Sequence, residues 1–338
     1  MVGDKFVKDR EKIKRGLLEN EYGEFPASPL GVYAERLPIN DADKMFCAGK
    51  APIERYLLRA EVYGQTVEFP IAVCVPKGKE KPVKTVISLN FERHFPNKYF
   101  PAEEIIDRGW GFVFLCYEDV TVDSAEMDRN AKILTSAFYT GKLIMWAWAA
   151  MRVRDFLETR DDIDQANVAV VGHSRLGKTA LLTAAFDKRF AFVHANNSGV
   201  GGAALYRETN SNSEDIKILA AIRPYWFAKK YPSFIGKEKE LPFDQDELLG
   251  LIAPRVLSIS SANGDPRANP QGEFHGARSA SIAWEELGFG GLIAPESAEV
   301  GVAYHQGKVG YYIREGVHYF SREDWNNALS FFEKNLIK

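Results

Sequence analysis

The sequence is poor in cysteine and nearly balanced in charge. Its 338 residues include three cysteines, Cys47, Cys74 and Cys116, whose spacing matches no metal-ligand pattern. Cys74 and Cys116 lie in apolar, strand-like runs, so we expect buried free thiols rather than a disulfide, which favours a reducing compartment. The formal net charge of -3 gives no electrostatic reason to expect nucleic acid or an anionic membrane as a partner.

Long apolar stretches are also missing. No run approaches the roughly 20 apolar residues that a membrane span requires, so we expect no membrane partner. Met1 leads straight into charged residues such as Asp4 and Lys5, without the apolar stretch of a signal peptide. This favours a cytoplasmic protein, whereas a trimmed N-terminus would be compatible with secretion. We expect a monomer that binds a small molecule or an oligosaccharide.

What the sequence does contain is an ordinary globular composition, with 46% hydrophobic and 26% charged residues. The length suits one large α/β domain. Residues 1–50 are punctuated by proline and glycine after a charged, helix-like start, and we interpret them as an N-terminal arm packed on the main domain. Residues 51–338 are predicted to form a single catalytic domain.

Apolar runs alternate with helix-like segments along that domain. Two runs, 54–62 and 66–75, are predicted to form an antiparallel hairpin. Further strands are predicted at 83–90, 111–117, 168–171, 190–195, 256–261 and 309–314, and helices at 101–108, 141–159, 178–186, 214–230, 275–287 and 322–336. This alternation predicts a three-layer α/β sandwich, whose mostly parallel sheet has an antiparallel N-terminal edge.

The most informative stretch joins the run 168–171 to a helix through Gly-His-Ser. A serine at a sharp turn between strand and helix is typical of the nucleophile elbow of α/β-hydrolases. Ser174 would then lie at the positive end of the helix dipole, where developing negative charge is stabilised. The second glycine, Gly177, follows the serine by three residues rather than two, which departs from the general motif.

A serine nucleophile needs a general base and a carboxylate that orients the base. His318 follows the strand 309–314 and precedes the last helix, which is where this fold delivers its base. Asp265 lies in the loop after the strand 256–261 and is the predicted acid. The sequence Gly-Asp-Pro also strongly favours a turn, so Asp265 could instead be a turn residue. Glu273 is the next candidate for the acid. His173, His194 and His275 are interpreted as structural.

The developing oxyanion requires hydrogen-bond donors. We expect the backbone N–H of Arg175 to supply one and the loop after Asn90 another. Arg175 and Lys178 also place two cations in the first turn of a helix, against the preferred sign of its dipole. This placement suggests that at least one of them serves the site.

The segment 172–178, Gly-His-Ser-Arg-Leu-Gly-Lys, resembles the Gly-x-Ser-Arg-x-Gly-Lys elbow of the glucuronoyl esterases of carbohydrate esterase family 15. Further segments resemble that family in the same order, over about residues 80 to 335: 197–204, 225–227, 241–245, 251–255, 269–274 and 313–318. Members of the family are α/β-hydrolases that cleave the ester between 4-O-methyl-glucuronic acid of xylan and lignin alcohols. They need neither a metal nor another cofactor.

The resemblance implies an esterase with Ser174 as nucleophile and His318 as base, in which the Arg175 side chain helps to form the oxyanion hole. It also implies that Lys178 and Glu214 hold sugar hydroxyls. Two positions depart from the family. Asn197 stands where many members carry the acid of the triad, so that Asp265 would supply it as in some bacterial members.

The second departure is Arg267, which stands where a tryptophan often packs on the uronic acid, and we include it among the substrate-binding candidates. Two other functions remain open. One is an acetyl or other acyl esterase that acts on hemicellulose, with the sugar on the alcohol side of the ester. The other is a carbohydrate-binding relative that has lost catalysis.

Overall fold

In the part of the chain that the structure describes, ten strands form one sheet. The computed structural model describes residues 6, 9–78 and 82–337. The strands follow the order β1-β2-β3-β5-β4-β6-β7-β8-β10-β9 across the sheet. Their bounds are β1 (Val32–Arg36), β2 (Ile53–Val62), β3 (Gln65–Cys74), β4 (Val83–Asn90), β5 (Gly111–Cys116), β6 (Ile163–His173), β7 (Phe192–Asn196), β8 (Val256–Ala262), β9 (Ala303–Tyr304) and β10 (Val309–Arg314).

The centre of the sheet is parallel and its edges are antiparallel. Strands β5, β4, β6, β7, β8 and β10 pair in parallel, whereas β1, β2 and β3 pair antiparallel with their neighbours, as does β9 with β10. The predicted hairpin and mostly parallel sheet are confirmed. Sequence reasoning missed β1, which lies outside the hairpin, because this five-residue strand has no fully buried residue.

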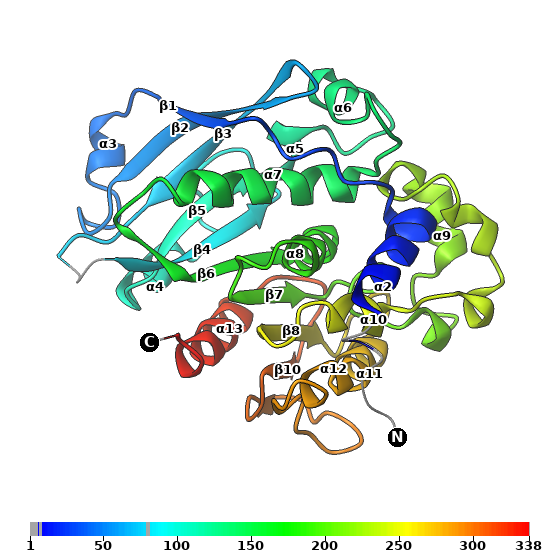
Figure 1. Cartoon of the computed structure of the whole chain (residues 1–338). Coiled ribbons are helices and arrows are strands. Elements are labelled where there is room, and N and C mark those ends of the chain that lie inside the picture. Colours follow the sequence, from blue (N-terminus) through cyan, green and yellow to red (C-terminus); the bar gives the residue numbers. More distant parts are fainter. Residues whose placement is uncertain (1–5, 7–8, 79–81, 338) are drawn as a thin grey trace.

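Helices cover both faces of the sheet and complete the predicted three layers (Figure 1). The larger apolar core includes α7 (Lys142–Leu157) and α8 (Arg175–Phe186) on one face. The smaller core joins the other face to α4 (Ala102–Asp107) and α13 (Arg322–Lys334). Two of the cysteines, Cys74 and Cys116, are buried as free thiols, as predicted.

Helix α7 shows why the core is large. Its side chains are buried on nearly every side of the helix, as expected for a helix packed between a sheet and other elements. Trp146 and Trp148 are 0% and 1% exposed, and their indole N–H groups donate to the carbonyls of Thr121 and Ala27. These tryptophans therefore pack the core.

The first 50 residues contact the rest of the molecule at several places. Helix α2 (Arg10–Leu17) continues into a π-helical turn (Leu18–Tyr22) whose Glu21 and Tyr22 are fully buried. Farther along, β1 extends the sheet by pairing with β2. The division into an arm of residues 1–50 and a catalytic domain of residues 51–338 stays a prediction, and part of the predicted N-terminal helix lies outside the described residues.

Two predicted helices differ from the observed ones. The helix expected at 214–230 is the shorter α9 (Ile216–Ile222), because Pro224 cannot continue it and starts a 3₁₀ turn (Pro224–Trp226) instead. The helix expected at 275–287 begins earlier, as α11 (Pro270–Ala280) followed by α12 (Ile282–Glu285). Asn269 caps α11 through Gly272 N–H, and Pro270 takes the first helical position, where proline is favoured.

Candidate active site

The turn between β6 and α8 presents Ser174 at the C-terminal edge of the sheet. Ser174 has φ 56° and ψ -127°, a conformation that few residues other than glycine adopt. Its N–H donates to the Asn196 carbonyl at 2.8 Å. A β-carbon at Gly172 would lie 2.0 Å from the Leu176 carbonyl oxygen, so only glycine fits where strand and helix approach each other. The strained serine of a nucleophile elbow is therefore present.

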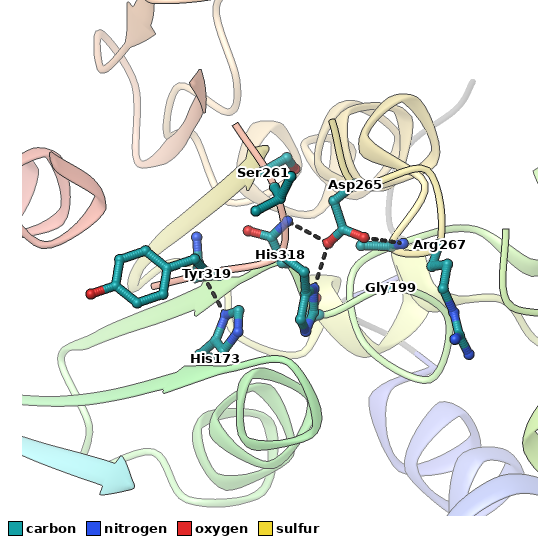
Figure 2. Close-up of polar contacts among 12 residues, drawn as sticks. His173, Gly199, Ser261, Asp265, Arg267, His318 and Tyr319 are labelled. Atoms are coloured by element: carbon teal, nitrogen blue, oxygen red, sulfur yellow. Dashed lines mark hydrogen bonds and ion pairs between the residues drawn. The ribbon is translucent and has the colours of Figure 1, made fainter. Parts of the chain in front are cut away.

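The predicted base and acid are in direct contact. His318 follows β10 by four residues and Asp265 follows β8 by three, and these two strands are neighbours in the sheet. His318 Nδ1 lies 2.5 Å from Asp265 Oδ2 (Figure 2). The imidazole is 45% exposed, whereas the carboxylate is 5% exposed. A buried acid thus orients a histidine that remains open to a ligand.

Asp265 accepts two further hydrogen bonds. Asn197 Nδ2 donates to Oδ2 at 2.7 Å and Ala268 N to Oδ1 at 3.4 Å. Burial by itself would raise the pKa of Asp265, but the hydrogen bonds from His318, Asn197 and Ala268 and the charge on His318 outweigh it and hold the pKa below its ordinary value. The acid is therefore ionised at neutral pH, as a carboxylate that orients an imidazole must be.

The predicted residues line one cavity of about 420 Å³. Its walls include all seven candidate site residues: Ser174, Arg175, Lys178, Glu214, Asp265, Arg267 and His318. They come from the ends of β6, β8 and β10, from α8 and from the irregular segment before α9. The structure thus brings these seven residues together in one cavity, and their catalytic and binding roles stay predictions.

The sugar-binding candidates form a chain of charges along one side of the cavity. Lys178 is 2% exposed, and its Nζ donates to the Val200 carbonyl at 2.6 Å and also to the Ser198 carbonyl. Glu214 lies 3.8 Å from Lys178 Nζ and 3.3 Å from Arg267 Nη2. The Arg267 side chain is 64% exposed and points away from Asp265 (Figure 2). Arg267 therefore stands at the rim, with Lys178 at the base.

Arg175 is held by residues that sequence reasoning missed. Its Nη1 donates to Asp123 Oδ2, and its guanidinium packs against the rings of Phe91 and Trp226, with centroids at 5.5 and 5.0 Å. Trp226 Nε1 donates to Asp123 Oδ1 at 2.7 Å, and Tyr225 OH to the Asp123 carbonyl at 2.9 Å. The position of Asp123 shortly after β5 could have predicted its place near Ser174. Segments that follow parallel strands reach the same edge of the sheet.

The remaining acid and histidine candidates are held elsewhere. Glu273 accepts hydrogen bonds from the N–H groups of Ser198 and Gly199 and from the hydroxyls of Ser198 and Ser261. It therefore supports the loop after β7 rather than His318. His194 binds Ser258 and Ser260 inside the sheet, and His275 pairs with Glu208.

His173 is also part of the packing around the site. Its Nδ1 is 2.6 Å from Asn196 Oδ1, and its ring lies 4.5 Å from that of His318, between centroids. Burial and the nearby His318 lower the pKa of His173 to about 3, so this imidazole is neutral and packs against the base.

Within residues 6, 9–78 and 82–337, no group of three or more histidine, cysteine or acidic side chains is arranged to hold a metal ion. In the same described ranges, no helix is both long enough and apolar enough to cross a membrane.

Comparisons with known proteins agree with this geometry. The family model described as "Glucuronyl esterase, fungi" matches residues 58–288. A carbohydrate esterase of an unknown prokaryotic organism is 34% identical over 242 residues, which are 69% of this chain and 55% of that protein. A 4-O-methyl-glucuronoyl methylesterase of Hypocrea jecorina is 35% identical over 160 residues, 45% of this chain and 35% of that protein. The matched parts thus span about half, or less, of these relatives.

Solved structures extend the similarity to nearly the whole chain. A glucuronoyl esterase from Solibacter usitatus is 29% identical with a TM-score of 0.83, over 97% of this chain and 92% of that one. A promiscuous esterase of carbohydrate esterase family 15 from a marine bacterial metagenome is 26% identical with a TM-score of 0.82, over 96% and 91% of the two chains. The chain therefore belongs to the glucuronoyl esterases of carbohydrate esterase family 15.

Proposed function

We propose that the protein is a serine esterase that hydrolyses the ester between glucuronic acid, or 4-O-methyl-glucuronic acid, and an alcohol. The observation that carries this proposal is the 2.5 Å contact between His318 and the buried Asp265, in the same cavity as the strained Ser174. The printed names of the relatives, a glucuronoyl esterase and a glucuronoyl methylesterase, support the substrate class.

The chemistry follows from the residues of the cavity. His318 takes the proton of Ser174 while the hydroxyl oxygen attacks the ester carbonyl, and Asp265 stabilises the imidazolium that forms. The oxyanion is bound by backbone N–H groups at the start of α8 and by Arg175. His318 then gives its proton to the departing alcohol. Water attacks the acyl-enzyme by the same route and releases the uronic acid.

The charged side of the cavity suits the sugar. Lys178 and Glu214 offer a donor and an acceptor for ring hydroxyls, and Arg267 adds a second cation at the rim. Burial lowers the pKa of Lys178, while Glu214 opposes that shift. Both residues are therefore positioned to orient the uronate so that its ester carbonyl faces Ser174.

We further propose that the enzyme is a monomer that acts on a small or oligosaccharide uronate ester. We further propose xylan carrying glucuronic acid esters of lignin alcohols as the polymeric context. A cytoplasmic location remains a proposal supported by the buried thiols of Cys74 and Cys116.

The test compares methyl 4-O-methyl-glucuronate with an acetylated xyloside, at equal enzyme concentration. We expect hydrolysis of the glucuronate ester, loss of turnover in Ser174→Ala and His318→Ala, and labelling of Ser174 by a fluorophosphonate. Faster release of acetate would favour an acetyl esterase. An unlabelled Ser174 with no hydrolysis of either ester would indicate a non-catalytic relative.

A further inference from the structure

Asn197 lies in the wall of the cavity and contacts the acid of the proposed triad directly. It follows β7 directly, is 1% exposed and has φ 46°, a left-handed conformation that asparagine tolerates better than most residues. Its N–H donates to the Ser260 carbonyl at 2.8 Å, which fixes its backbone against β8. The side chain is thereby directed at the carboxylate of Asp265.

Two donors converge on one oxygen of Asp265. Asn197 Nδ2 lies 2.7 Å from Oδ2, and His318 Nδ1 lies 2.5 Å from the same atom. Asn197 Oδ1 is buried and has no hydrogen-bond partner, so the contact with Asp265 is what holds the amide of this residue. Hydrogen bonds to an ionised carboxylate are stronger than those between neutral groups, and they favour the charged form.

We propose that Asn197 is a positioning residue, whose amide orients the Asp265 carboxylate toward His318 and keeps it ionised. The inference rests on the proposed esterase function. It gives a role to the residue at which this chain departs from the acidic residue of many family members. A carboxylate at 197 would stand beside Asp265 and compete for one proton, whereas an amide donates to it.

Several other charged groups face this pair, and any pH dependence must be separated from theirs. Several charged groups surround Asp265 and His318: His173 on β6, Lys178 and Arg175 on α8, Glu273 on α11, Arg267 on the loop of Asp265, Glu214 across the cavity, and Arg314, which donates to the carbonyls of Val317 and Tyr319 on the two sides of His318. Burial raises the pKa of Glu273 to about 7. None of these groups is altered in the variants below, so a shift relative to the wild type reports on residue 197.

The first variant, Asn197→Asp, is almost isosteric and tolerates a positive φ. It places a second carboxyl group against Asp265, and two carboxyl groups at that distance titrate as a coupled pair with one strongly raised apparent pKa. The added negative charge also favours protonated His318. We therefore expect the acidic limb of the pH profile to move to higher pH by about one unit or more.

The second variant, Asn197→Gly, removes the donor and relieves the positive φ. We expect kcat at neutral pH to fall about tenfold or more, because the lost hydrogen bond is to a charged group. KM should change little, because the proposed sugar contacts are made by Lys178 and Glu214. Replacing a residue with a purely structural role would not lower kcat while leaving KM nearly unchanged.

Asn167→Asp is the matched control. Asn167 is 2% exposed, and its Nδ2 donates to Asp164 Oδ2 at 2.7 Å, which is the same contact outside the cavity. The control creates a second pair of adjacent carboxyl groups, with Asp164 half-buried, and should leave the pH profile unchanged. It therefore separates a local effect on the triad from the general cost of placing two carboxyl groups together.

The readout is the rate at which a fluorophosphonate labels Ser174 across pH, together with kcat and KM for methyl glucuronate. The inference would be overturned if the wild type and Asn197→Asp had the same pH profile of the labelling rate. It would also be overturned if Asn197→Asp and Asn167→Asp shifted that profile equally. Labelling depends on the triad and not on the sugar. If the wild-type protein is labelled but does not cleave glucuronate esters, the proposed substrate is refuted. The labelling rates of the variants would still test the role of Asn197.

Discussion

The cavity has two walls that are held in place by different means. The sheet wall carries Ser174, Asn197, Asp265 and His318, which follow β6, β7, β8 and β10 in the order of the sheet. The covering wall carries Glu214, Ile222, Arg223 and Trp226, in a segment of short helices and turns. Backbone pairing in the sheet fixes the strand ends of the first wall, whereas the second wall lies outside the sheet and depends more on side-chain hydrogen bonds.

Buried carboxyl groups provide those side-chain hydrogen bonds. Asp123 binds Trp226, and Asp244 accepts from the N–H groups of Tyr206 and Arg207. Glu21 accepts from Tyr206 OH at 2.6 Å and from Gln245, and its backbone carbonyl accepts from Ala228 N–H. The residues proposed for catalysis thus lie on the sheet wall, whereas Glu214, one of the proposed sugar contacts, lies on a wall whose geometry depends on a few polar contacts.

The largest effect should come from breaking the sheet wall at Asp265. Asp265→Asn keeps the shape of the side chain but removes the charge that stabilises the His318 imidazolium, and it favours the wrong tautomer of that ring. We expect kcat to fall by about 10³- to 10⁴-fold, as in serine hydrolases of other folds. Steady-state kinetics on methyl glucuronate would measure this loss, with Asp164→Asn as a distant control. Activity within tenfold of the wild type would move the acid elsewhere.

An intermediate effect should come from Asp123, which joins the two walls by binding both Arg175 and Trp226. Asp123→Asn keeps an acceptor for one of them but loses the ion pair with the guanidinium. We expect kcat/KM to fall by about 10- to 100-fold, because charged hydrogen bonds of this kind contribute roughly 1.5–3 kcal/mol.

The control for this prediction is Asp119→Asn, which changes a carboxylate on the same stretch that pairs with Arg93 instead. If Arg175 stabilises the oxyanion, kcat should decline in Asp123→Asn. A change confined to KM would show that Asp123 acts through the shape of the covering wall alone.

The smallest effect on activity should come from Glu21, under the covering wall, where the change is expected in stability instead. Burial raises the pKa of Glu21 from 4.5 to about 8, against opposing hydrogen bonds from Tyr206, Gln245 and Tyr22. Because the folded chain holds this proton more tightly than the unfolded chain, the free energy of unfolding should decrease as pH rises from about 4.5 to about 8. The slope from this group is at most about 1.4 kcal/mol per pH unit.

Urea denaturation at several pH values tests this prediction. In Glu21→Gln, the free energy of unfolding should decrease less steeply above neutral pH. The decrease that Glu273 causes through its own raised pKa should remain. Glu24→Gln, at an exposed neighbouring position, should behave as the wild type. An unchanged slope in Glu21→Gln would mean that Glu21 does not control the stability of the covering wall.

The sequence was a good guide to the sheet wall. Apolar runs located the strands of the parallel centre, and the order of strand ends placed Ser174, Asp265 and His318 on the loops where they are found. The covering wall was hard to predict because short 3₁₀ turns have no apolar period, and because Pro224 ends α9 early. The sequence drew attention to Glu214 there, but not to Arg223 or to the contacts of Trp226.

Local chemistry within the sequence determined the elbow, because Gly172, Ser174 and the start of α8 are close in the chain and constrain one another directly. Only the tertiary structure decided what lies beside them. Asp123 is 52 residues from Arg175, and Asn197 is 68 residues from Asp265. Such pairs are made by neighbouring strand ends and by packing across the cavity, and no local pattern records them. The elbow was thus fixed by nearby residues, and its polar surroundings by the whole fold.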